Sequence, residues 1–198
     1  MNLRVTENDI KVLEGVYRFR FLELVQIMLL IGTTKEATAY TRVRRLKQLG
    51  MIGGKALLAR GQAYHLTVEG MKLIRQEGRE IKIGLGSYEH DIKTAQVLLE
   101  FLVQGKEIIT ERELRVEQRG IAGHWPDGVV LDGKKKIAIE VELSDKAAVR
   151  VAGIIDFYIK ASYEQVWYFT DSKSVEVLLG RVIKQKGADD FIKVKPLG

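Results

Sequence analysis

Apolar residues recur every three or four positions near the start of the chain, which is the spacing of an amphipathic helix. Three helices are predicted there, over residues 7–18, over residues 21–30, and from Thr33 or Thr34 to about Leu49. Thr6 is the expected N-cap of the first helix, and Gly50 is the expected C-terminal stop of the third. Alternating residues then predict two strands, and Thr67 is expected to cap a fourth helix.

The third predicted helix has an apolar stripe and a polar, basic face. Ala39, Val43 and Leu46 recur at helical spacing and are expected to face the core. The residues expected to contact DNA from this helix are Lys35, Thr38, Thr41, Arg42 and Arg45. Arginine can bind guanine or phosphate, and threonine can bind phosphate or touch a thymine methyl group. The pattern is therefore typical of a helix that enters the major groove.

A β-hairpin is predicted directly after this helix. Residues 51–52 and 55–59 form its first strand, residues 60–62 its turn, and residues 63–67 its return strand. Lys55 lies in the first strand and Arg60 at the tip, and we expect both cations to contact DNA. Arg60 would enter a minor groove or meet a phosphate.

The positive charge of the chain is confined to its first part. The net charge is +6, and residues 1–84 hold 15 lysines and arginines against 8 acids, whereas residues 85–198 hold 17 against 18. Residues 41–60 carry six cations and no acid. A compact basic block favours a polyanionic partner, and the alternative is a solvated helix face.

The order helix, helix, helix, hairpin, helix over residues 5–76 resembles winged helix-turn-helix proteins, as do the segments TRVRRLKQLGMI and YHLTVEG. The resemblance implies double-stranded DNA as the partner, and a homodimer, since such proteins commonly bind paired half-sites. Some winged helices bind proteins instead. We therefore expect a winged helix DNA-binding domain over residues 1–78 and a glycine-rich linker over residues 79–86.

A second domain of mixed helices and strands is predicted over residues 87–198. Its helix from residue 87 precedes strands over residues 107–117, near Asp127 and near Glu140. A helix capped by Ser144 then leads to a buried strand over residues 166–170, and a helix and a short strand follow. By the crossover rule, the strand at residues 166–170 lies parallel to its neighbour.

Three carboxylates are predicted to meet in this domain. The turn at Asp132-Gly133 folds two strands together, so Asp127 at the start of one lies beside Glu140 at the end of the other. Side chains alternate along a strand, so Glu142 points the same way as Glu140. Clustered carboxylates need a cation, a proton or exposure to water, and oxygen ligands of this kind suit Mg²⁺ or Mn²⁺.

This segment resembles the PD-(D/E)xK nuclease superfamily, in which an Asp and a Glu bind metal and a following Lys assists water. The resemblance implies an αβββαβ core, Asp127 and Glu140 as metal ligands if the domain is active, and Asp127, Glu140 and Glu142 as the catalytic positions. Glu142 stands where that superfamily has the lysine, and Lys146 and Lys160 on the next helix are candidates to replace it. The fold class is thus α+β, with a winged helix domain and a PD-(D/E)xK-like α/β domain.

The two domains together resemble the replication-relaxation family of plasmids and mobile elements. The motifs are Glu89-His90-Asp91, Pro126-Asp127 and Glu140-x-Glu142. The resemblance implies an accessory role in plasmid replication, DNA relaxation or conjugative mobilisation, with a relaxase or a replication initiator as partner. Because Glu142 adds negative charge where a nuclease needs positive charge, we expect no cutting and no cofactor.

Two other functions stay open. The alternative is an endonuclease or nickase that depends on Mg²⁺ or Mn²⁺, and the third is a protein-interaction adaptor. The chain has no cysteine, so disulfides and cysteine-ligated zinc are excluded. The sequence has no apolar run long enough to span a bilayer, and we expect a cytoplasmic protein without a membrane partner.

Overall fold

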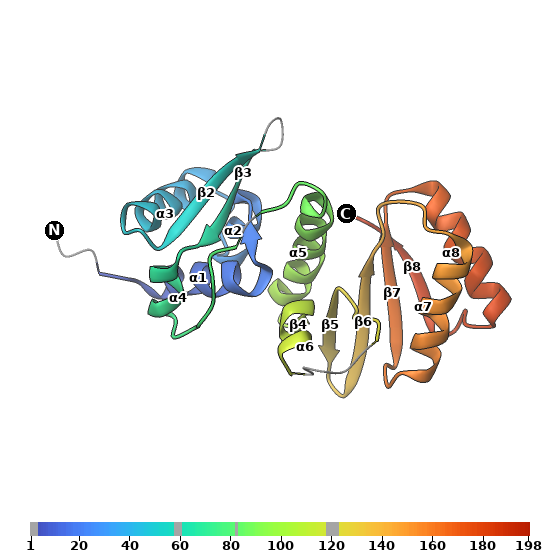
Figure 1. Cartoon of the computed structure of the whole chain (residues 1–198). Coiled ribbons are helices and arrows are strands. Elements are labelled where there is room, and N and C mark those ends of the chain that lie inside the picture. Colours follow the sequence, from blue (N-terminus) through green and yellow to red (C-terminus); the bar gives the residue numbers. More distant parts are fainter. Residues whose placement is uncertain (1–3, 58–60, 82, 118–122) are drawn as a thin grey trace. The chain divides into compact units, whose positions relative to one another are not determined.

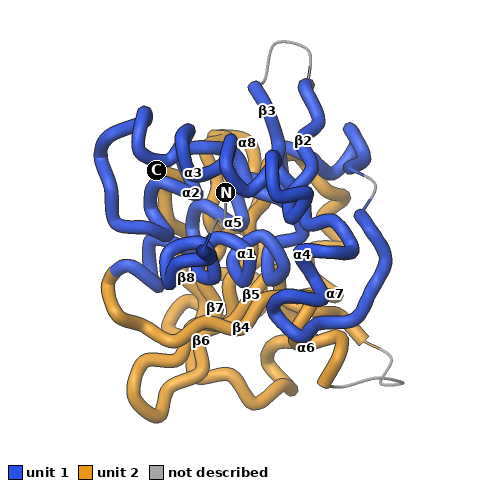
Figure 2. Tube along the Cα trace, turned by 90° about the vertical axis from the view of Figure 1, so that its left-hand side faces the viewer, with its two compact units in different colours: residues 1–103 blue, residues 104–198 orange. Residues whose placement is uncertain are grey.

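A computed structural model describes residues 4–57, 61–81, 83–117 and 123–198. The chain divides into two compact units, Met1–Val103 and Gln104–Gly198, which Figure 2 shows in different colours. Both units mix helices and strands, and each contains one sheet. The α+β class expected from the sequence is therefore confirmed. No helix among the described residues has both the length and the apolar character needed to cross a membrane.

Unit 1 places a three-stranded antiparallel sheet among helices, with strand order β1-β3-β2 (Figure 1). Its elements are α1 (Glu7–Phe19), β1 (Phe21–Leu22), α2 (Leu24–Leu30), α3 (Glu36–Gln48), β2 (Ile52–Leu57), β3 (Gly61–Leu66), α4 (Val68–Leu73) and α5 (Tyr88–Val103). The hairpin of β2 and β3 directly follows α3, as predicted. Ala39, Val43 and Leu46 of α3 are buried, so the predicted apolar stripe is confirmed.

Two helix starts in unit 1 differ from the prediction. Phe21 and Leu22 were expected to begin the second helix, but they form β1 because their backbone pairs with His65 and Tyr64 of β3. Helix α2 begins only after Glu23. The N-cap of α3 is Lys35, not Thr33 or Thr34, and its side chain makes no capping hydrogen bond.

Helix α5 belongs to unit 1, although we expected this segment to open the C-terminal domain. The ring of Tyr88 stacks on Phe21 with 5.4 Å between the ring centroids, and the Tyr88 hydroxyl donates to Glu23. These contacts attach the start of α5 to the β1–α2 segment. The division between the units therefore falls after α5.

Unit 2 is built on a five-stranded sheet of order β4-β5-β6-β7-β8 (Figure 1). Its elements are β4 (Glu107–Thr110), α6 (Glu111–Glu117), β5 (Gly128–Asp132), β6 (Lys135–Val141), α7 (Ala148–Lys160), β7 (Gln165–Thr170), α8 (Lys173–Lys186) and β8 (Ile192–Pro196). The pairs β4–β5 and β5–β6 are antiparallel, whereas β6–β7 and β7–β8 are parallel. The parallel crossover through α7 is confirmed.

Two predicted elements of unit 2 have different bounds. The strand expected over residues 107–117 ends at Thr110, whose backbone N–H and hydroxyl both donate to the Glu113 carboxylate. The backbone N–H of Glu113 donates in turn to the Thr110 hydroxyl. These reciprocal hydrogen bonds start α6, because they satisfy N–H groups that have no partner within the helix. Helix α7 begins after Ala147, not after Ser144.

The β5–β6 hairpin sets the position of the acidic residues. Asp132 pairs with Lys135, which leaves a two-residue turn, and Gly133 there has a φ of 63° that favours glycine. Gly128 pairs with Ile139. Asp127 and Glu140 are the next residues outward from that pair, so they lie side by side as the sequence predicted.

Candidate functional site

Helix α3 presents a polar and basic face to solvent. Its exposed residues are Ala37, Thr38, Tyr40, Thr41, Arg44, Lys47 and Gln48, together with Glu36 at its start. Thr41, Arg44 and Gln48 are spaced by three and four residues, so they form one row along the helix. The only acid of α3 is Glu36, in its first turn. This face therefore has hydroxyl, amide and cationic groups beyond that first turn and no carboxylate.

Arg42 and Arg45 do not lie free on that face. Arg42 Nη1 is 2.7 Å from Asp9 Oδ1, and Arg45 Nη2 forms an ion pair with Asp9 Oδ2. The side chains of Arg42 and Arg45 are 19% and 26% exposed, whereas that of Asp9 is 0% exposed. We expected both arginines to point outward. They lie beside the buried stripe instead, where a long side chain can reach across to α1.

The carboxylate of Asp9 is bound by Thr6 at the start of α1 as well as by the two arginines of α3. The backbone N–H of Thr6 donates to Asp9 Oδ2 at 2.7 Å, and the Thr6 hydroxyl donates to the same atom at 2.8 Å. Thr6 is the N-cap of α1, as predicted, and Asp9 completes the capping box. A buried carboxylate is costly unless it is paired and hydrogen-bonded. The two arginines of α3 and the cap of α1 together meet that requirement.

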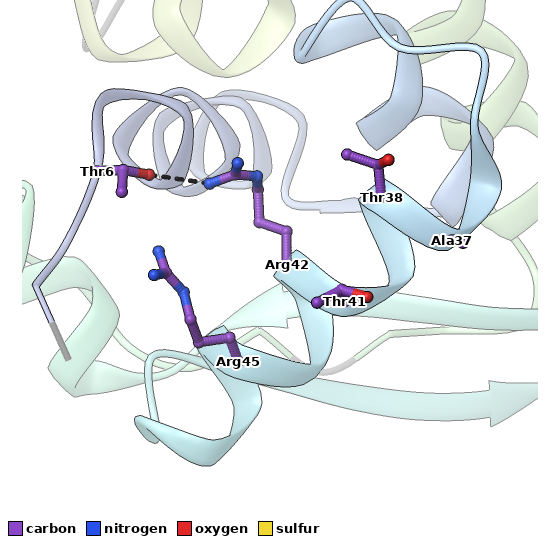
Figure 3. Close-up of a pocket in the computed structure, with 6 residues that line it drawn as sticks. All are labelled: Thr6, Ala37, Thr38, Thr41, Arg42 and Arg45. Carbon is purple, nitrogen blue, oxygen red and sulfur yellow. Dashed lines mark hydrogen bonds between the residues drawn. The ribbon is translucent and has the colours of Figure 1, made fainter. Parts of the chain in front are cut away.

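A groove of about 510 Å³ lies between α3 and the start of α1 (Figure 3). Its lining residues are Thr6, Ala37, Thr38, Thr41, Arg42 and Arg45. Arg42 reaches across the groove and donates to the Thr6 hydroxyl at 2.9 Å (Figure 3). Because Asp9 offsets only one of the two guanidinium charges, this group of three side chains keeps a net positive charge.

Two of the three remaining cations predicted to bind DNA, Lys35 and Lys55, are exposed. Lys35 is exposed at the N-terminal end of α3. Lys55 of β2 is exposed, and its Nζ donates to the carbonyl oxygen of Ile83 at 2.9 Å. Arg60 lies outside the described residues. Arg44 and Lys47, which we did not select from the sequence, are exposed on α3.

In unit 2, Asp127 and Glu140 each bind groups of the chain itself. Asp127 Oδ2 accepts a hydrogen bond from the backbone N–H of Val141 at 2.7 Å. Glu140 is 5% exposed, and its Oε1 is joined to His124 Nε2 at 2.6 Å. The hydroxyl of Tyr158, from α7, donates to the same Oε1. The hairpin register therefore brings the two acids together, and residues outside it complete the site.

Glu142 is paired with a lysine from the following segment. Its Oε2 forms an ion pair with Lys146 Nζ, and Glu142 itself is nearly buried at 8% exposed. Lys146 was one candidate to replace the absent lysine, and it neutralises Glu142. Lys160, the other candidate, is exposed at the end of α7.

The three acids of the cluster are linked electrostatically through one buried tyrosine. Burial raises the pKa of Glu140, the hydrogen bond to His124 opposes that rise, and the charge of Asp127 adds to it. Burial also raises the pKa of Tyr168, and the charges of Glu140, Glu142 and Asp127 raise it further. Tyr168 is 3% exposed, and its hydroxyl has no hydrogen-bond partner in the described part of the chain. All three carboxylates thus act on one tyrosine.

His124, Tyr158 and Tyr168 were not selected as site residues from the sequence. Tyr158 follows Val151 and Ile155 at helical spacing, which is the pattern of an ordinary core residue. Tyr168 lies opposite Glu140 in the parallel β6–β7 pair. One feature of the sequence could have identified part of this site: His124 precedes Asp127 by three residues, in a segment that leads into the same strand.

A divalent metal ion at the cluster would have to share its oxygen atoms with donors of this chain. Such an ion needs several unprotonated oxygen or nitrogen ligands directed at one point. Asp127, Glu140 and Glu142 each have an oxygen already bound to a donor of this chain. The described residues contain no group of three or more histidine and acidic side chains that could hold a metal ion.

Comparisons with known proteins assign the chain to no family. No protein-family model matches the chain, and no curated protein matches it. The exposed face of α3 and the carboxylate cluster are therefore the two features from which a function can be inferred.

Proposed function

We propose that unit 1 is a winged helix-turn-helix domain that binds double-stranded DNA through α3. The observation that carries the proposal is the exposed face of α3, where Arg44 and Lys47 stand beside threonine hydroxyls. Arginine, lysine and threonine are the side chains that commonly contact DNA phosphates and bases. Beyond the first turn, which contains Glu36, this face can lie in a major groove without burying an acid.

The order of elements supports the winged-helix assignment. Three helices precede a hairpin, and a further helix follows it. In this arrangement α3 is the recognition helix and the β2–β3 hairpin is the wing. Lys55 extends the positive surface onto the hairpin, and Lys35 extends it to the start of α3.

The cations near α3 divide into two roles. Arg44 and Lys47 are exposed and supply phosphate or base contacts, with Thr38 and Thr41 beside them. Arg42 and Arg45 are positioning residues, because their guanidinium groups hold α3 against Asp9 of α1. This division changes the expectation from the sequence, in which Arg42 and Arg45 contacted DNA directly.

The salt dependence of DNA binding tests this proposal. The slope of log Kd against log salt should fall by about 0.9 for each duplex phosphate that a variant no longer neutralises. We expect Arg44→Ala and Lys47→Ala each to weaken binding and to lower the slope by about one. Lys72→Ala is the matched control, since Lys72 is an exposed lysine of unit 1 on α4 and pairs with Glu69.

Unchanged affinity and slope in an Arg44→Ala/Lys47→Ala double variant would refute binding through α3. Absence of binding to any duplex at low salt, by a folded wild-type protein, would instead favour the protein-interaction adaptor. Both measurements use the full chain.

We extend the proposal to unit 2 as a PD-(D/E)xK-like domain that does not cut. The mixed sheet and the Asp127–Glu140 pair support the likeness. The partners already bound to all three acids argue against the endonuclease alternative. Nicking of supercoiled plasmid with Mg²⁺ or Mn²⁺ that disappears in Asp127→Ala would reverse this conclusion.

The biological setting of the proposal comes from the sequence resemblance. On that basis the protein is an accessory factor in plasmid or mobile-element replication, DNA relaxation or conjugative mobilisation. Its protein partner would be a relaxase or a replication initiator. Selection of bound sequences from a random DNA library would test it, because an accessory factor of this kind binds a defined site.

A further inference from the structure

Each acid of the carboxylate cluster of unit 2 is bound to a group of this chain. Asp127 accepts from a backbone N–H, Glu142 pairs with Lys146, and Glu140 binds both His124 and Tyr158. Clustered acids require cations, protons or water, and buried ones cannot rely on water. The structure therefore shows which groups meet that requirement at each acid.

His124 is the group that closes the cluster at Glu140. Its imidazole meets Tyr158 edge to face, with 5.4 Å between the ring centroids, and Phe157 likewise at 5.8 Å. These two aromatic contacts from α7 fix the plane of the imidazole. Its Nε2 is then held on Glu140 Oε1 at 2.6 Å.

We propose that the imidazole of His124, through its bond to Glu140, closes a latent two-carboxylate metal site formed by Asp127 and Glu140. The inference concerns unit 2 alone, so it stands or falls independently of DNA binding by unit 1. The inference goes beyond the proposal that unit 2 does not cut DNA, because it names His124 as the residue that prevents metal binding. It also predicts that removing the His124 imidazole allows a metal ion to bind.

His124 and a metal ion would compete for one oxygen atom. A carboxylate oxygen has two lone pairs, so an oxygen that already accepts two hydrogen bonds can bind a metal ion only after it loses one of them. On Glu140 those are the bonds to His124 and Tyr158. Removing the imidazole takes away one of them and leaves space beside two neighbouring acids.

Mn²⁺ titration followed by electron paramagnetic resonance tests the inference, because the signal of free Mn²⁺ falls when the ion binds. At pH 8, we expect the signal of free Mn²⁺ to be the same with wild-type protein as in buffer alone. His124→Ala should bind one equivalent, about tenfold or more tightly than wild type. The double variant His124→Ala/Asp127→Asn should return to the wild-type result, which would identify the ligands.

His124→Gln is the matched control, since its amide can still donate to Glu140 and should keep the site closed. Mn²⁺ binding by wild type that is lost in Asp127→Asn would overturn the proposal. So would a folded His124→Ala that binds no Mn²⁺. If His124→Ala does not fold by circular dichroism, His124→Ser takes its place, because it also removes the imidazole from Glu140 but keeps a polar side chain at a partly exposed position. A folded His124→Ser without Mn²⁺ binding would then overturn the proposal.

Discussion

Oδ1 of Asp9 lies 2.7 Å from Nη1 of Arg42, and the same carboxylate pairs with Arg45. The pair joins the first turn of α1 to the middle of α3. It gives Asp9, which completes the capping box of α1, a second role as the anchor for the proposed recognition helix. The orientation of α3 therefore depends on a buried acid that belongs to another helix.

Substituting Asp9 by Asn should destabilise the protein by about 2–3 kcal/mol, because two guanidinium groups lose their counter-charge. This loss is smaller than is usual for a fully buried pair, since both arginines are partly exposed. Urea unfolding measures the change. Glu7→Gln is the matched control, because Glu7 lies in the same turn but is 84% exposed, and it should change stability by less than about 0.5 kcal/mol. Equal losses in the two variants would contradict the anchoring role.

Arg42→Ala should weaken DNA binding without the change in salt slope expected for Arg44→Ala. A positioning residue affects the affinity through the orientation of α3, whereas a phosphate contact releases counterions and sets the slope. Arg42→Lys, which keeps the charge but not the two-pronged geometry, should recover only part of the affinity. Fluorescence anisotropy at several salt concentrations provides both quantities. A slope reduction of about one in Arg42→Ala would show that Arg42 contacts phosphate directly.

Two tyrosines of unit 2 should respond oppositely to the same chemical change. Tyr158→Phe should cost about 1.5–3 kcal/mol, because it removes a donor from the buried carboxylate of Glu140. Tyr168→Phe should leave stability unchanged or raise it by up to about 1 kcal/mol, because its buried hydroxyl has no partner among the described residues. The free energy of unfolding in urea distinguishes them. A larger loss in Tyr168→Phe than in Tyr158→Phe would disprove this assignment of hydrogen bonds.

The stability of the protein should fall as pH rises through the raised pKa of Glu140. Burial raises that pKa above its ordinary value of 4.5, so the folded state holds the proton more tightly than the unfolded state does. The stability that this proton binding adds is fully present below about pH 4.5, and it is lost as pH rises through the pKa of Glu140 in the folded state. Asp127, His124 and Tyr158 face Glu140 and act on the same equilibrium.

Glu140→Gln removes this titration while it keeps an oxygen acceptor for His124 and Tyr158. The stability of wild type relative to Glu140→Gln should therefore decrease steadily as pH rises above about 4.5. Urea unfolding of both proteins from about pH 4 to about pH 8, in about one-unit steps, measures the difference. A difference that stays constant or grows with pH would contradict the raised pKa.

Local rules in the sequence were sufficient for the elements that carry the sites. The N-cap at Thr6 and the buried stripe Ala39, Val43 and Leu46 depend on neighbours within one or two turns. The register of the β5–β6 hairpin depends on its two-residue turn, and it placed Asp127 beside Glu140. The strand predicted over residues 107–117 was too long because the Thr110–Glu113 exchange, also local, outweighs the apolar alternation.

Contacts between distant elements settle which charged groups are available. Helical periodicity assigns Arg42 to the outer side of α3, but its partner Asp9 lies 33 residues earlier in the chain. Glu140 similarly meets Tyr158 from a later helix, 18 residues away. A buried charge is stabilised by whichever donor the fold brings within hydrogen-bonding distance, and no local pattern contains that information. Local sequence thus specifies where along each element the charged side chains stand, and the packing of separate elements specifies which of them are already bound.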